Sequence, residues 1–181
     1  TNTDTNTTKA DSTVTKPESL ASSLIVLENE GITLTEVVSP EFTDSKLTML
    51  SPSQDTTLQV GPVNFEFNVN GGKYILGSQS NDAETKRCSN SSKGQHIHVI
   101  LDNEPYEASY TTSYTTKAQL EAGNHVALTF ISRSYHESLK HNGAYQLTQF
   151  KVGDHDGMDS INLEAPHLFY SRPKGSYEAE N

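Results

Sequence analysis

The strict alternation of residues 63–69, Val-Asn-Phe-Glu-Phe-Asn-Val, constrains the fold of this chain more than any other feature. Successive side chains of a β-strand point to opposite faces, so the four apolar residues share one face and the polar residues take the other. Further short apolar runs recur between polar turns, and long helical periodicity is weak throughout. Many short strands joined by polar turns predict an all-β protein built as an antiparallel β-sandwich.

The other expected strands flank recognisable turn residues. Asn29-Glu30-Gly31 is a plausible turn between two short strands within residues 23–38, and Gly71-Gly72 makes another turn after the alternating segment. We expect the remaining extended segments at residues 47–58, 73–77, 96–102, 103–116, 124–131 and 143–152.

The alternation in two later expected strands predicts where the histidines point. In the segment His-Ile-His-Val-Ile-Leu-Asp, residues 96–102, period-2 geometry assigns Ile97, Val99 and Leu101 to the core face. His96 and His98 then share the opposite face with Ile100. In the segment 124–131 we expect the core set to be Val126, Leu128 and Phe130, which turns His125 away from the core.

Composition divides the chain and limits its partners. Residues 1–23 are rich in Thr and Ser and have almost nothing to bury, so we expect a disordered, flexible tether followed by a sandwich domain over residues 24–181. The net charge of -10 disfavours nucleic acid and anionic lipid as partners. No apolar run approaches the length of a transmembrane helix, and the single cysteine, Cys88, excludes an internal disulfide framework.

The histidines are the strongest candidate site. A His-x-His pair on a strand presents two imidazoles on one side, and imidazole suits Zn or Cu. His125 projects from a second strand and His136 follows that strand, so His96, His98, His125 and His136 together could bind a metal ion. The alternative is that these are ordinary histidines held by hydrogen bonds.

Three weaker candidates remain open. Arg133, Tyr135 and His141 could bind an anion, or they could belong to an ordinary connection. Residues 153–159, Gly-Asp-His-Asp-Gly-Met-Asp, resemble a minimal calcium loop but fit an Asp-Gly turn better. A tyrosine series spaced by four residues could form a sugar-binding platform, and its members are Tyr106, Tyr110 and Tyr114. No catalytic motif is complete, so we expect a non-enzymatic protein.

An ordered series of motifs resembles a known group of proteins. It comprises "LSPSQDTTLQVGPVNFEFNV", "GQHIHVILDN", "LEAGNHVALTFISRSYHESLK" and "PHLFYSRPKG". Over roughly residues 40–175 the chain is similar to uncharacterised envelope lipoproteins of Bacteroidetes, some of them labelled phosphopeptide-binding. It departs from their pattern at Asp55, where the opening motif often has Gly, and in an unusually polar loop over residues 78–93.

The resemblance implies a fold, a location and a set of histidines. The fold would be an immunoglobulin-like or cupredoxin-like sandwich in the periplasm or on the outer membrane. The family histidines fall on His96, His98, His125 and His136. The Thr/Ser-rich start resembles the tether after a lipidated Cys, which would be the only membrane attachment, and the natural chain would continue past Asn181.

Two functions follow from these observations, together with a weaker third. The first is a non-enzymatic envelope lipoprotein that acts as an accessory or partner-binding subunit of an outer-membrane or periplasmic assembly. The second is a periplasmic copper or zinc protein that uses the histidines, and the third is a carbohydrate-binding module.

Overall fold

The computed structural model describes residues 26–35, 42–154 and 161–170. The proposed tether, residues 1–23, and most of the candidate calcium loop, residues 155–160, lie outside the described residues. The chain divides into two compact units, residues 1–39 and residues 40–181. No helix within the described ranges has the length and apolar character needed to cross a membrane.

The first unit contains a β-hairpin of two short strands, β1 (Val26–Asn29) and β2 (Ile32–Thr35), which pair antiparallel. Its turn is the expected one, with Glu30 and Gly31 both in the left-handed region at φ 48° and 79°. Positive φ at both central residues is what a two-residue hairpin turn requires. The hairpin clusters with the N-terminal unit, so the sandwich of the second unit begins at β3.

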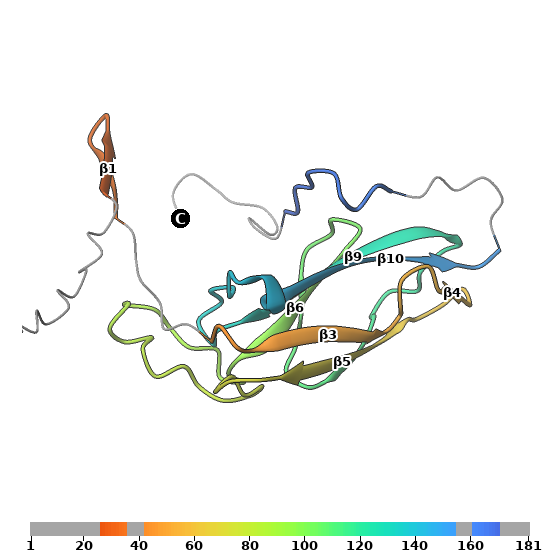
Figure 1. The fold of residues 1–181 in the computed structure, drawn as a ribbon, viewed down its shortest axis with the longest axis horizontal. Coiled ribbons are helices and arrows are strands. Elements are labelled where there is room, and N and C mark those ends of the chain that lie inside the picture. Colours follow the sequence, from red (N-terminus) through yellow and green to blue (C-terminus); the bar gives the residue numbers. More distant parts are fainter. Residues whose placement is uncertain (1–25, 36–41, 155–160, 171–181) are drawn as a thin grey trace, which may run out of the picture. The chain divides into compact units, whose positions relative to one another are not determined.

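The second unit is a sandwich of two sheets, and Figure 1 shows its strands in two layers. One sheet has the order β3-β5-β8 and the other the order β4-β10-β9-β6-β7. The strands are β3 (Lys46–Ser51), β4 (Thr57–Leu58), β5 (Asn64–Asn70), β6 (His96–Leu101), β7 (Glu107–Ser109), β8 (Ser113–Thr115), β9 (Gly123–Ser132) and β10 (Tyr145–Val152), with a 3-10 turn η1 (Asn142–Ala144) before β10.

The strand order confirms an immunoglobulin-like sandwich. In the form of that fold whose fourth strand pairs with the third, the first, second and fifth strands form one sheet, and the third and fourth join the last two in the other. Here β3-β5-β8 and β7-β6-β9-β10 reproduce this division. The first strand also changes sheet, because β3 pairs with β5 while its continuation β4 runs parallel to β10.

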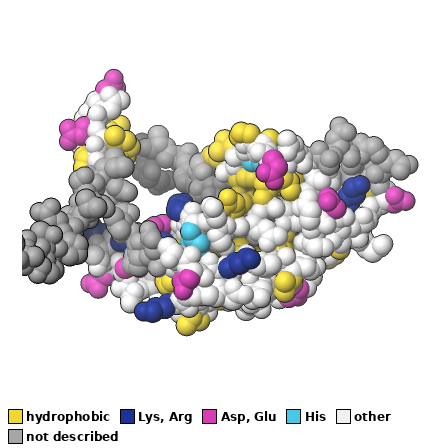
Figure 2. All heavy atoms as spheres, viewed as in Figure 1, with side chains coloured by type: hydrophobic (Ala, Val, Ile, Leu, Met, Phe, Trp, Pro, Cys, Tyr) yellow, Lys and Arg dark blue, Asp and Glu magenta, His cyan; other side chains and the backbone are white. Residues whose placement is uncertain are grey.

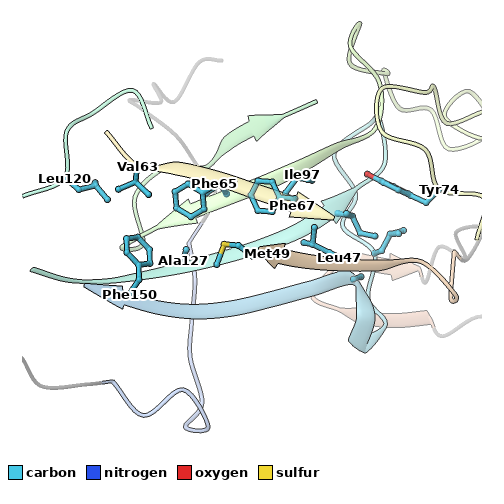
Figure 3. Packing of buried hydrophobic residues seen from close by; sticks show 14 of the residues in the cluster. Leu47, Met49, Val63, Phe65, Phe67, Tyr74, Ile97, Leu120, Ala127 and Phe150 are labelled. Carbon is cyan, nitrogen blue, oxygen red and sulfur yellow. The ribbon is translucent and has the colours of Figure 1, made fainter. Parts of the chain in front are cut away.

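Apolar side chains from both sheets form one core (Figure 3). The alternation of residues 63–69 is confirmed, since Val63, Phe65 and Phe67 are at most 3% exposed. Phe65 of β5 meets Phe150 of β10 edge to face across the two sheets, with ring centroids 5.9 Å apart. Burying large aromatic rings in this way contributes several kcal/mol to stability, on the order of 1.5–3 kcal/mol for each side chain.

The predicted faces hold for β6 but not for β9. Ile97 and Val99 of β6 lie in the core, as expected. In β9, however, Ala127 and Ile131 belong to the core. The expectation that Val126, Leu128 and Phe130 form the core face is therefore wrong. Both faces of β9 carry apolar residues, and the larger ones take the outer face because a later segment of the chain covers it.

That covering segment is residues 161–170, drawn in blue in Figure 1 on the side of the sheet away from β3 and β5. The amide of Ile161 donates to the side chain of Gln149 on β10 at 2.5 Å. The amide of Tyr170 donates to the side chain of Asn103, just beyond β6, at 2.6 Å. The segment therefore crosses the outer face from one side of the five-stranded sheet to the other.

Candidate functional site

Two buried histidines meet on the outer face of β6. His96 and His98 are 0% and 4% exposed, and their Nε2 atoms are 2.8 Å apart. Their rings stack with centroids 4.8 Å apart. The period-2 prediction that they share a face is therefore confirmed, but that face is covered by other side chains.

The covering side chains come from the residues just before and just after the neighbouring strand β7. Ala108 of β7 lies directly opposite His98, so Tyr106 and Tyr110, two residues to either side, project toward the same face. The Tyr106 ring stacks on His98 at 4.2 Å, and the Tyr110 ring lies 4.9 Å from His96. The small Ala108 between the tyrosines leaves room for the imidazole.

His136 closes the site from the connection between β9 and β10. Ser132, the last residue of β9, is paired with His96, so this connection begins beside the histidine pair. A tight loop follows, in which the amide of Arg133 donates to the carbonyl of Glu137. The exposed His136 has a left-handed φ of 71° and lies with its ring 4.8 Å from His96 and 6.0 Å from His98. A non-glycine residue held in that region stores strain, as is common at functional sites.

The hydrogen bonds fix the tautomer of His96. Its Nδ1 lies 2.8 Å from the carbonyl oxygen of Gly94, which can only accept, so Nδ1 carries the proton. Burial is the main cause that lowers the pKa of His96, and nearby His136 lowers it further, while the bond to Gly94 opposes both. In the neutral ring Nε2 is then an acceptor, and His98 donates its Nε2 proton to it.

The buried hydroxyl of Tyr74 links β6 and β9 at this end of the sheet. Its oxygen lies 3.1 Å from the carbonyl oxygen of His96 and 2.8 Å from that of Ser132, and so ties β6 to β9 at the level of the pair. Burial raises the pKa of Tyr74, so the hydroxyl keeps its proton as a donor. Nothing in the local sequence pattern distinguishes Tyr74 from an ordinary strand residue.

His125 does not join the other three histidines. Its side chain lies on the core face of β9, with its ring 5.7 Å from that of Phe150, so the expectation that His125 points away from the core is wrong. Phe130, which pairs with His98, lies on the other face and five residues away, roughly 17 Å along the strand. Its Nδ1 is 2.6 Å from Asp102 Oδ2 and its Nε2 is 3.1 Å from the carbonyl oxygen of Glu121. Asp102 Oδ1 also accepts from the amide of Val126, so Asp102 links the end of β6 to the start of β9. We call these contacts of His125 and Asp102 the clamp.

The remaining candidates point to separate partners. Arg133 is buried beside Glu137, with its guanidinium carbon 5.8 Å from the Phe42 ring centroid. The hydroxyl of Tyr135 donates to Asp82 at 2.7 Å, and His141 donates from Nε2 to the carbonyl oxygen of Ser45. Lys86 lies 3.5 Å from Glu137 and 3.9 Å from Asp82, so Arg133 and Tyr135 belong to one network of charged groups. His141 bonds outside this network.

The tyrosine series does not form a platform either. Tyr106 and Tyr110 flank β7, but Tyr114 lies on β8 in the other sheet. There it packs against Phe65, with ring centroids 6.1 Å apart. The spacing of four residues spans a crossing between sheets, so a common face is lost.

An apolar groove of about 500 Å³ lies on the outer face of the five-stranded sheet. Its floor includes Phe130, whose ring is 4.8 Å from that of His98, so the groove borders the histidine pair. Its apolar lining comes from β9, β10, the β9–β10 connection and residues 161–170, and comprises Leu128, Phe130, Leu139, Tyr145, Leu147, Leu163 and Phe169.

Imidazole rings gather at this site, but they are not already arranged as a metal centre. Across the described ranges, no set of three or more His, Cys, Asp or Glu side chains is already placed to hold a metal ion. The donor atoms that do converge are the two Nε2 atoms of His96 and His98.

Comparisons with known proteins add little. No family model matches the chain, and no curated protein matches it. Among solved structures, the fibronectin(III)-like modules of CbhA from Clostridium thermocellum match with 9% identity and a TM-score of 0.38. The match covers 78% of this chain and 62% of that one. The fold assignment therefore rests on the strand order described above.

Proposed function

We propose that this protein is a non-enzymatic domain of the bacterial cell envelope that binds a partner protein through the outer face of its five-stranded sheet. The apolar groove on that face carries the proposal. Residues 161–170 cross this face but leave a groove between themselves and the sheet, and Leu128 of β9 and Leu147 of β10 line it. A contiguous apolar surface rimmed by polar groups is typical of a protein interaction site.

The surroundings of the groove extend this apolar surface. Along residues 161–170, Leu168 is 87% exposed and Tyr170 is 52% exposed. Figure 2 shows hydrophobic side chains gathered over this part of the molecule. Aromatic and aliphatic side chains of this kind form the energetic centre of many interfaces. The net charge of -10 favours a partner surface that is neutral or basic around its apolar contact.

The envelope location is supported by the sequence. The Thr/Ser-rich composition of residues 1–23 fits a tether, and the motif series resembles envelope lipoproteins. A tethered binding domain serves as an accessory subunit because the tether keeps it near a membrane-bound assembly at high effective concentration.

Co-purification with matched variants tests the proposal. The tagged full chain is isolated from detergent-solubilised envelopes of its native host, and the bound proteins are identified and quantified. Leu147→Glu places a charge in the groove, and Leu50→Glu places the same charge on β3, where Leu50 is already 58% exposed.

We expect a defined partner to bind the parent chain and the Leu50→Glu variant equally and to fall at least about tenfold with Leu147→Glu, because burying an unpaired charge is costly. Thermal melting confirms that both variants fold. A chain that purifies alone, or a partner retained by a folded Leu147→Glu variant, contradicts the proposal.

A further inference from the structure

We propose that His96 and His98 form a chelating pair for a zinc or copper ion, which recruits His136 as its third ligand. This site is independent of partner binding. It differs from the four-histidine site expected from the sequence, because His125 belongs to the clamp at the other end of β6 and β9.

The first step concerns the direction of the donor atoms. Both Nε2 atoms point at the same small volume, 2.8 Å apart, from one rigid strand. Two imidazole nitrogens bound to one tetrahedral zinc ion at 2.0–2.1 Å lie about 3.3 Å apart. The pair therefore needs to open by only about 0.5 Å for a metal ion to lie between the two nitrogens. The Nε2 proton of His98 then moves to its Nδ1, so both rings bind the ion as neutral imidazoles.

The second step concerns preparation of the ligand. Histidines that bind metals usually donate their other ring N–H to a carbonyl or carboxylate, which fixes the tautomer and the ring orientation. His96 does this toward the carbonyl of Gly94 at 2.8 Å. Its Nε2 lone pair is thereby directed toward His98 before any ion binds.

The third step concerns the additional ligand and the route of entry. His136 is the exposed member of the cluster and lies edge-on to both rings, at 4.8 Å and 6.0 Å between centroids. Since the pair itself is buried, an ion reaches it when the short loop carrying His136 shifts. The same ring then turns a nitrogen toward the ion, and solvent completes the coordination.

Metal titration of the purified full chain tests this site. After treatment with a chelator, the protein is titrated with ZnCl₂ and separately with CuCl₂ at pH 7.5, and binding is measured by calorimetry. We expect one ion per chain for at least one of the two metals. His96→Gln and His98→Gln should weaken binding by more than about 100-fold and His136→Gln by about tenfold or more.

His167→Gln is the matched control, because His167 is also exposed and its Nε2 lies 2.9 Å from the carbonyl oxygen of Asn162. It should bind the ion as the parent chain does. An equal loss in this control, or unchanged affinity in His136→Gln and either pair variant, overturns the proposal.

A second measurement covers variants that fail to fold. In the parent chain, two-dimensional NMR of the imidazole nitrogens reports each ring separately. On addition of zinc the Nε2 signals of His96 and His98 should shift while the Nδ1 proton of His96 stays in place. If calorimetry shows zinc binding, then shifts confined to His125, His141 or His167, or no shift at saturating zinc, overturn the proposal.

Discussion

Each end of the β6–β9 pair carries a buried or half-buried histidine, and the hydrogen-bond partners of these histidines differ between the two ends. At one end, His125 faces two groups that only accept, the carboxylate of Asp102 and the carbonyl of Glu121. At the other end, His96 faces one carbonyl and another histidine. The comparison teaches that neighbouring acceptors, and not the residue type, decide which ring nitrogen of a histidine is left to accept.

The direction of each ring follows from these partners. Both nitrogens of His125 face oxygen atoms that accept, so neither is directed at another histidine. His96 donates from Nδ1 to the carbonyl of Gly94, and its Nε2 faces His98. That nitrogen is therefore the one that the proposed metal site uses.

Removing the carboxylate of the clamp should have the largest effect on stability. Asp102→Ala loses the acceptor for His125 and for the amide of Val126, and should lower the free energy of unfolding by about 2–3 kcal/mol. Asp102→Asn keeps one acceptor and tolerates the left-handed φ of 51°, so about 1 kcal/mol is expected.

Urea unfolding measures both changes, and metal affinity measured on the same variants sharpens the comparison. The account predicts unchanged metal affinity, because the clamp and the pair lie at opposite ends of β6 and β9. A metal affinity that falls in step with stability would show that the two ends are not separate.

A smaller effect is expected from acid at the histidine pair. Burial and His136 lower the pKa of His96 in the folded protein, so the unfolded chain binds this proton more readily. The contribution of His96 is complete above its ordinary pKa of about 6.5 and is lost as the pH falls from there through the lowered value.

Unfolding free energies between pH 7.5 and pH 5 test this sign. The parent chain should lose at most about 1.4 kcal/mol per pH unit from this one group. His96→Gln should show a shallower loss, and His167→Gln should follow the parent chain. If the unfolding free energy of His96→Gln falls as much as that of the parent chain, the histidine pair does not contribute to the acid sensitivity.

Sequence periodicity predicted the sandwich and half of the site. The alternation in β5 and β6 was decisive because one face of each strand is clearly more apolar, as Phe65 and Ile97 illustrate. In β9 both faces carry apolar residues, so periodicity alone could not assign Leu128 and Ala127 to their faces. The covering by residues 161–170, which resolves the choice, depends on contacts distant in sequence.

The tyrosines of the site show the same limit. A Tyr-x-Ala-x-Tyr alternation over Tyr106, Ala108 and Tyr110 signals a common face, and it was available in the sequence. Its alignment with His98 depends on the register between β6 and β7, which the turn at Asp102 and Asn103 sets. The position of His136 depends on the loop after β9, for which no periodic signal exists.

The proton positions of His96 and His98 at pH 7.5 test the account of the histidine pair most directly. Nitrogen NMR of the metal-free parent chain distinguishes a protonated ring nitrogen from an unprotonated one. We expect a proton on Nδ1 of His96, no proton on its Nε2, and a proton on Nε2 of His98. A proton on Nε2 of His96 would contradict the account.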